Sequence, residues 1–147
     1  MERLLVFACV VVTAVAVPIT FKECISTGGE GQVKSVDISP CPVQPCVFTK
    51  NVTATVKVTF TAPQDSGSLK AQIYGIIEGI KVGWAMPDPD GCHSNITCPV
   101  TGGNVYTYTS TLGVPKGAPK LRLVVEWSLT GSKGEKQFCF DFPMEIS

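Results

Sequence analysis

The sequence predicts an all-β domain, an immunoglobulin-like β-sandwich of two antiparallel sheets. Three observations predict it. Apolar and polar residues alternate over several stretches with the period of two that half-buried strands show, and no stretch has a helical period. Gly and Pro are frequent in the segments between these stretches. An even number of cysteines follows residue 16, as expected of a small domain stapled by disulfide bonds. The 147 residues suffice for one domain with a modest core.

The clearest alternation runs from Val52 to Thr61, where even positions are apolar and odd positions are Thr or Lys. Similar strands are expected over 69–77, 121–129 and 138–146, with shorter ones over 32–38 and 106–112, which makes six or seven strands in all. The expected inward-facing residues are Val52, Ala54, Val56, Val58, Phe60, Leu69, Ala71, Ile73, Gly75, Ile77, Leu121, Leu123, Val125, Trp127, Leu129, Phe138, Phe140, Phe142, Met144 and Ile146.

Residues 1–16 have the pattern of a secretory signal peptide. Arg3 supplies the positive start, an apolar run follows from Leu4 to Val15, and Ala14-Val15-Ala16 is a small-residue cleavage site. A transmembrane anchor is the alternative, but it would need about 20 apolar residues. We therefore expect a soluble, secreted chain that starts at Val17 and forms one domain over residues 17–147.

Removing that segment removes Cys9 and leaves six cysteines, two closely spaced pairs and two distant residues: Cys41 with Cys46, Cys92 with Cys98, and Cys24 and Cys139. Six cysteines allow 15 pairings. Each close pair flanks a short loop, so local pairing is plausible and would leave the two distant cysteines to join the ends of the fold. A zinc site is the rival interpretation. It lacks ligands, because neither close pair is C-x-x-C and His93 is the one histidine of the chain.

Two tripeptides are acceptors for N-linked glycans. They are Asn51-Val52-Thr53 and Asn95-Ile96-Thr97, and such sequons mark surface sites in secreted proteins. Glycosylation at Asn51 and Asn95 is therefore a prediction of the sequence.

Composition excludes several classes of function. The formal net charge is zero, with 12 basic and 12 acidic residues, whereas nucleic-acid binding calls for a basic surface. A catalytic triad would have to use His93, which adjoins a cysteine in a presumed disulfide loop. Asp88 and Asp90 lie between prolines, as turn residues do, and no phosphate-binding loop is present. We expect no enzyme activity, no metal and no cofactor.

The apolar stripes themselves allow two structures. Two sheets can interdigitate their side chains into a filled core about 10 Å thick, which is the ordinary outcome. They can also splay and leave a cavity lined by the same side chains. Alternation does not distinguish these structures.

Several segments resemble one family. They are 39–46 (SPCPVQPC), 87–92 (PDPDGC) followed by Cys98-Pro99, 123–127 (LVVEW) and 20–24 (TFKEC). Across essentially the whole mature chain, they resemble the Niemann–Pick type C intracellular cholesterol transporter 2 family, the epididymal secretory proteins among the ML lipid-recognition domains. The resemblance implies a sandwich of seven to eight strands and the pairs Cys24–Cys139, Cys41–Cys46 and Cys92–Cys98. It also implies a tunnel between the sheets that takes up a sterol tail-first.

The resemblance also implies a set of lipid-binding residues. At the tunnel mouth it implies Trp84, where the family has a smaller aromatic residue, Val114, and Ala118, where vertebrate sterol carriers have a tyrosine. The rim for hand-off to a membrane sterol transporter falls near Glu78, Gly79 and Ile80, and Glu78 replaces an apolar residue. The deeper pocket positions fall on Ile38, Phe48, Val56, Ile77, Val82, Leu123, Val125, Trp127, Phe140 and Phe142.

We therefore expect a secreted, monomeric carrier that holds one sterol or other apolar lipid and transfers it between membranes, extracellularly or in lysosomes. Contact with membrane surfaces and with a membrane sterol transporter would be transient. An extracellular lipid-recognition protein of innate immunity or chemical sensing is the alternative, because Ala118 widens the mouth for other cargo. A filled sandwich used for adhesion is the third possibility.

Overall fold

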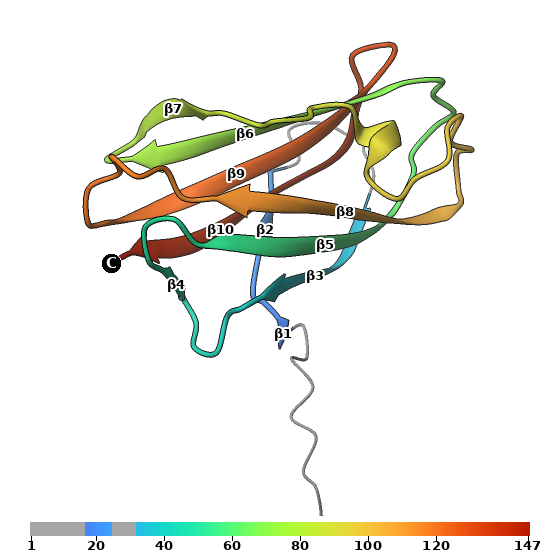
Figure 1. Cartoon of the computed structure of the whole chain (residues 1–147). Coiled ribbons are helices and arrows are strands. Elements are labelled where there is room, and N and C mark those ends of the chain that lie inside the picture. Colours follow the sequence, from blue (N-terminus) through green and yellow to red (C-terminus); the bar gives the residue numbers. More distant parts are fainter. Residues whose placement is uncertain (1–16, 25–31) are drawn as a thin grey trace, which may run out of the picture.

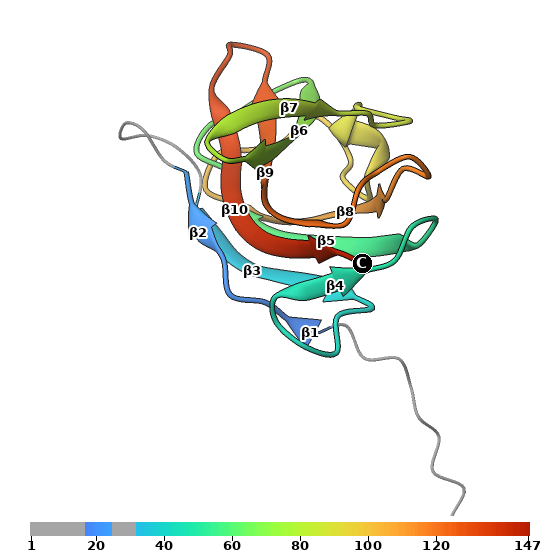
Figure 2. The same cartoon turned by 90° about the vertical axis from the view of Figure 1, so that its left-hand side faces the viewer.

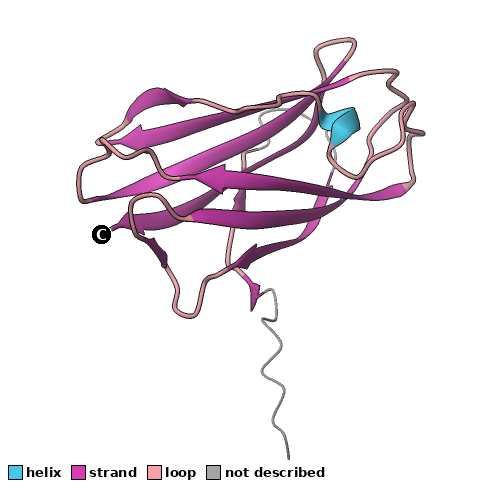
Figure 3. Ribbon diagram, viewed as in Figure 1, coloured by secondary structure: helices cyan, strands magenta, loops and turns pink. Residues whose placement is uncertain are grey.

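The chain folds into two stacked β-sheets (Figure 1). The structure is a computed structural model and describes residues 17–24 and 32–147. The signal peptide expected over residues 1–16 lies outside the described residues. Apart from one short 3₁₀ turn, η1 (Gly91–His93), every regular element of the described residues is a β-strand, so the all-β prediction is confirmed (Figure 3).

The first sheet has the strand order β1-β3-β5-β8. Its strands are β1 (Val17–Pro18), β3 (Gln32–Ser39), β5 (Thr53–Thr61) and β8 (Val105–Gly113). The second sheet has the order β2-β10-β9-β6-β7. Its strands are β2 (Lys22–Glu23), β10 (Lys136–Ile146), β9 (Leu121–Gly131), β6 (Leu69–Ile77) and β7 (Ile80–Trp84). The short β4 (Cys46–Phe48) pairs with β10 in parallel, while the other pairs are antiparallel.

Strand order leaves β8 and β7 at edges of their sheets, β8 in the first and β7 in the second. Figure 2 shows the two layers along the strands, with β10 curving from one layer toward the other. The polypeptide that follows β7 and the polypeptide that follows β8 therefore meet at an open side of the sandwich.

The predicted inward stripes form the core. Along β5, buried residues alternate with exposed or half-buried ones, and β10 buries Phe138, Phe140, Phe142, Met144 and Ile146. Aromatic rings pack at the centre, with Phe60 and Phe138 edge to face at 5.0 Å and Tyr108 and Phe138 at 5.4 Å between ring centroids. Such contacts stabilise a core beyond the area they bury.

The strands that alternation did not predict are β1, β2, β4 and β7. The first three are two or three residues long, too short to show a period. In β7 the residues from Ile80 to Gly83 are exposed and Trp84 is half-buried, because an edge strand packs on one side only.

The three disulfides are the ones implied by the family resemblance. Cys24–Cys139 closes a loop of 115 residues, tying the segment after β2 to the middle of β10. Cys41–Cys46 and Cys92–Cys98 close loops of 5 and 6 residues. Among the described residues, no helix is long and apolar enough to cross a membrane.

Candidate functional site

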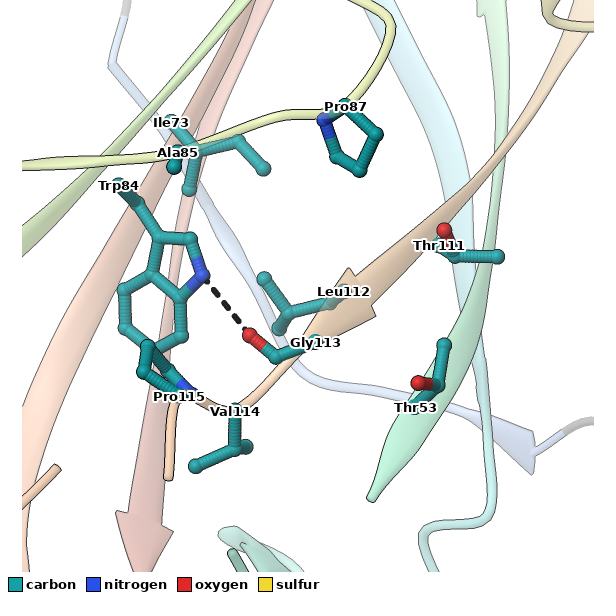
Figure 4. A pocket seen from close by; sticks show the side chains of 10 residues that line it. All are labelled: Thr53, Ile73, Trp84, Ala85, Pro87, Thr111, Leu112, Gly113, Val114 and Pro115. Atoms are coloured by element: carbon teal, nitrogen blue, oxygen red, sulfur yellow. Dashed lines mark hydrogen bonds between the residues drawn. The ribbon is translucent and has the colours of Figure 1, made fainter. Parts of the chain in front are cut away.

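The expected mouth residues meet where β7 and β8 end. Trp84 is the last residue of β7, and Val114 directly follows β8. The indole of Trp84 reaches across to the other sheet, and its Nε1–H donates a hydrogen bond to the carbonyl oxygen of Gly113 at 3.0 Å (Figure 4). This bond joins the edge strands of the two sheets, so the Trp84 indole spans the gap between the ends of β7 and β8.

Trp84 lines three depressions of the surface, and two of these also reach Pro115 and are described here. The first has a volume of about 330 Å³ and the second about 310 Å³. Trp84, Ala85 and Pro115 line both depressions and therefore separate them. Each volume lies at the lower end of the range for small-molecule pockets.

The first depression lies beside β5 and β8. Its other lining residues are Thr53, Ile73, Pro87, Thr111, Leu112, Gly113 and Val114. The second depression lies over the end of the inter-sheet core. Its other lining residues are Gly75, Ile77, Val82, Gly83, Ala118, Pro119, Leu121, Leu123 and Ile146. Neither set includes a charged side chain, so both depressions suit an apolar ligand.

The floor of the second depression is formed by core residues. Leu123 and Ile146 are buried, with 6% and 4% of their surface exposed, and they come from the neighbouring strands β9 and β10. A group seated in this depression therefore touches the apolar interior directly.

Gly75 lies between the side chains of Leu123 and Trp84. A Cβ atom at Gly75 would lie 3.1 Å from Cδ1 of Leu123 and 3.5 Å from Cε3 of Trp84. A side chain there would press on Leu123, which would have to shift, whereas its contact with the indole would have ordinary van der Waals length. Alternation placed Gly75 on the inward face but not in the site, because no local signal ties it to a residue nine positions away.

Most of the expected deep residues are buried in the core. They are Ile38, Phe48, Val56, Val125, Trp127, Phe140 and Phe142, each with at most 1% of its surface exposed. They pack against one another, as the stacked rings of Phe140 and Phe142 show at 6.0 Å. The open volumes described above lie at the mouth, next to this packed region.

Val82 was expected among the deeper positions, and this expectation is wrong. It is 49% exposed and lies at the rim of the second depression. The reason is that β7 is an edge strand at the open side of the sandwich. Ile77 and Ala118 line the same depression and are half-buried.

The two depressions are lined by residues from distant parts of the sequence, and many of these were not among the expected lipid-binding residues. They include Gly75, Ala85, Gly113, Pro115, Leu121 and Ile146. The nearest local signal is the run of small residues and prolines over 113–119, which is typical of a loop that must pass close to a neighbour.

His93 lies away from the mouth on η1, between two carboxylates. Its Nδ1 is 2.8 Å from Oδ2 of Asp88 and its Nε2 is 3.4 Å from Oδ2 of Asp90. The hydrogen bond with Asp88 and the charge of Asp90 raise the pKa of His93, and the same hydrogen bond lowers the pKa of Asp88. All three side chains are largely exposed. This is an ion-pair cluster at the surface and not a buried catalytic pair.

We expect NMR titration of His93, the one histidine of the chain, to give a pKa above the ordinary value of about 6.5. The ion pair with Asp88 is complete only while His93 is protonated and Asp88 is ionised. Its contribution to stability is therefore lost as pH rises through the raised pKa of His93, and also as pH falls through the lowered pKa of Asp88. Asp88→Asn should lower the pKa of His93, whereas the same pKa in both proteins would contradict the assignment.

The described residues offer one cluster of possible metal ligands, formed by Cys24, Glu126 and Cys139. Both cysteines of this cluster are joined in a disulfide, so their sulfur atoms are not thiolate ligands. This cluster therefore does not support a metal site.

A model of the ML domain matches residues 18–146. NPC intracellular cholesterol transporter 2 of Bos taurus is 41% identical over 134 residues, which cover 91% of this chain and 89% of that protein. The protein of the same name from Danio rerio is 38% identical over 129 residues, with 88% and 85% covered.

Solved structures share the fold. A Niemann–Pick type C2 protein from Japanese carpenter ant superposes with a TM-score of 0.79 at 26% identity, covering 88% of this chain and all of that chain. Chicken MD-1, solved in complex with lipid IVa, has a TM-score of 0.54 at 18% identity and covers 84% of this chain and 85% of that chain. The latter likeness concerns the fold alone.

The fold and the match over residues 18–146 place this protein among the ML domains, a class of non-enzymatic lipid-binding proteins. The chain belongs to the ML-domain family and, within it, to the family of NPC intracellular cholesterol transporter 2.

Proposed function

We propose that this protein is a soluble carrier that holds one sterol, or another apolar lipid of similar size, between its sheets. The observation that carries this proposal is the second depression, which is uncharged and runs from the mouth to the buried residues Leu123 and Ile146. The lipid would enter tail-first there, displacing the Trp84 indole and parting the packed side chains behind it. Its polar end would stay at the mouth, near water.

The energetics are adequate for tight binding without a charged anchor. Burial of a few hundred Å² of hydrocarbon contributes on the order of 10 kcal/mol at about 25 cal/mol per Å². The loss of translational freedom and the opening of the packed core reduce this gross value. The remainder is enough for saturable binding at low concentration.

Secretion and passage to lysosomes belong to the same proposal. Three disulfides favour an oxidising compartment, as the secretory pathway provides. A membrane sterol transporter is the proposed recipient of the cargo. Glu78 lies in the turn between β6 and β7, next to the mouth, and adds a charge to the rim that this recipient would meet.

The test is titration of the secreted protein with a fluorescent sterol and with a panel of fatty acids, together with mass spectrometry of any lipid that co-purifies. We expect saturable binding of the sterol with one lipid per protein. Failure to bind either class of lipid would refute the proposal and favour the filled, adhesive sandwich.

Recognition of a microbial or signalling lipid outside the cell is the second candidate. Ala118 favours it, because a small residue lines the second depression and leaves room for a broader head group. In the same titration, bound lipids other than sterols and no transfer of sterol between vesicles would select this function.

Trp84→Phe should speed the exchange of bound sterol. Phenylalanine keeps an apolar ring at the mouth but cannot donate the hydrogen bond to Gly113. A bond of this kind contributes about 1 kcal/mol, which corresponds to roughly fivefold in rate if the bond must break before the lipid leaves. Stopped-flow exchange of a fluorescent sterol measures this rate, and an unchanged rate in a folded variant would show that the bond does not hold the mouth closed.

A further inference from the structure

The sequon at Asn51 lies at the lip of the mouth. Asn51 is exposed and belongs to the turn between β4 and β5, where the N–H of Val52 donates to the carbonyl of Thr49 at 3.2 Å. Two further hydrogen bonds attach this turn to the mouth. The N–H of Asn51 donates to the carbonyl of Val114 at 3.3 Å, and the N–H of Val114 donates to the carbonyl of Val52 at 3.2 Å.

The third residue of the sequon is part of the mouth itself. Thr53 lines the first depression together with Val114 and Trp84 (Figure 4). A glycan on Asn51 would therefore start two residues from the depression wall. Because such a glycan is bulky and hydrated, it would cover the lip on the β5 and β8 side.

The opposite lip, on β7, carries exposed aliphatic side chains. Ile80 and Val82 of β7 are 67% and 49% exposed, and Val82 lines the second depression. The mouth is thus asymmetric, with a sequon on one lip and exposed aliphatic side chains on the other. Exposed apolar side chains that cluster beside a depression favour contact with another apolar surface.

The second sequon provides an internal comparison. Asn95 is also exposed, but it follows η1, which lies at the far end of the sandwich from the turn between β4 and β5 (Figure 1). A glycan there would leave the mouth uncovered.

We propose that Asn51 carries an N-linked glycan that shields the Val114 lip of the mouth, so that membranes meet the mouth only by its β7 lip. This inference rests on the proposed lipid-carrier function for its effect on transfer. The glycan restricts the orientations in which a loaded protein can meet a vesicle productively, and restricted orientation lowers a rate of association. It does not touch the buried lipid, so the equilibrium affinity is unaffected.

The variants must leave the turn intact. Asn51 and Asn95 both have positive φ, 68° and 65°, a conformation that glycine adopts without strain. Asn51→Gly and Asn95→Gly therefore remove each sequon while keeping its turn.

The proteins are expressed in a glycosylating secretory host, and glycan occupancy is measured by mass spectrometry. Transfer of a fluorescent sterol to phosphatidylcholine vesicles is then followed. We expect Asn51→Gly to transfer about threefold to tenfold faster than the natural chain at equal affinity. Asn95→Gly, the matched control, should transfer at the rate of the natural chain.

A second measurement does not depend on cargo. Vesicles containing nitroxide-labelled lipid quench tryptophan fluorescence on contact, and Trp127 is fully buried, so quenching reports Trp84. We expect stronger quenching in Asn51→Gly and not in Asn95→Gly. The inference would be overturned if Asn51 carried no glycan, if quenching were equal in all variants, or if Asn95→Gly had the same effect as Asn51→Gly. If the expected quenching were seen without sterol binding, only the carrier function would be refuted.

Discussion

Removal of the Cys24–Cys139 disulfide is expected to lower the free energy of unfolding by about 4.7 kcal/mol. The bond closes a loop of 115 residues, and a cross-link over so long a loop removes much of the conformational entropy of the unfolded chain. It also holds the β2 segment against β10, where the N–H of Cys24 donates to the carbonyl of Cys139 at 3.0 Å. The double variant Cys24→Ala/Cys139→Ala and denaturant unfolding measure the loss.

The short disulfide Cys92–Cys98 is the matched control. Its loop spans 6 residues, so the same reasoning predicts a loss of only about 2 kcal/mol for Cys92→Ala/Cys98→Ala. Equal losses in the two double variants would mean that loop closure is not the main source of the stabilisation. Because typical domains are stable by only 5–15 kcal/mol, the first variant should also unfold well below the melting temperature of the natural chain.

Val114→Phe is expected to weaken sterol binding tenfold or more, a change of about 1.4 kcal/mol. Val114 is 5% exposed and lines the first depression beside Trp84. The larger ring would fill the space into which the Trp84 indole must turn when a lipid enters. Titration with a fluorescent sterol measures the affinity.

Val114→Ala is the control, since it widens the same depression and should keep the affinity within a few-fold. Thermal unfolding of both variants separates lost binding from lost folding, because an oversized core residue costs about 1–3 kcal/mol by itself. Unchanged affinity in a folded Val114→Phe variant would place the lipid path away from this side of Trp84.

The core stripes were predictable because strand patterning is local. Side chains on a strand alternate between two faces, so the inward set over 52–60 or 138–146 can be read from the sequence without knowing which strands are neighbours. The short strands β1, β2 and β4 were not predictable by this route, because two or three residues carry no period.

The mouth residues could be proposed only through family resemblance, and their role in lipid binding stays a prediction. Trp84, Val114 and Ala118 do lie together, whereas Val82 lies at the rim instead of deeper. Exposure of a residue depends on whether its strand has one neighbour or two, and strand order is not a local property.

The sequence by itself determined the fold class, the inward faces of the long strands and the even set of cysteines, because each follows from residues close together in the chain or from their count. Only the tertiary structure decided that the indole of Trp84 bonds to Gly113, that Gly75 adjoins both Leu123 and this indole, and that Asn51 adjoins Val114. These contacts join residues 9 to 63 positions apart, and they depend on which strands pair: β6 with β7, β5 with β8, and β7 and β8 as edge strands at one side of the sandwich.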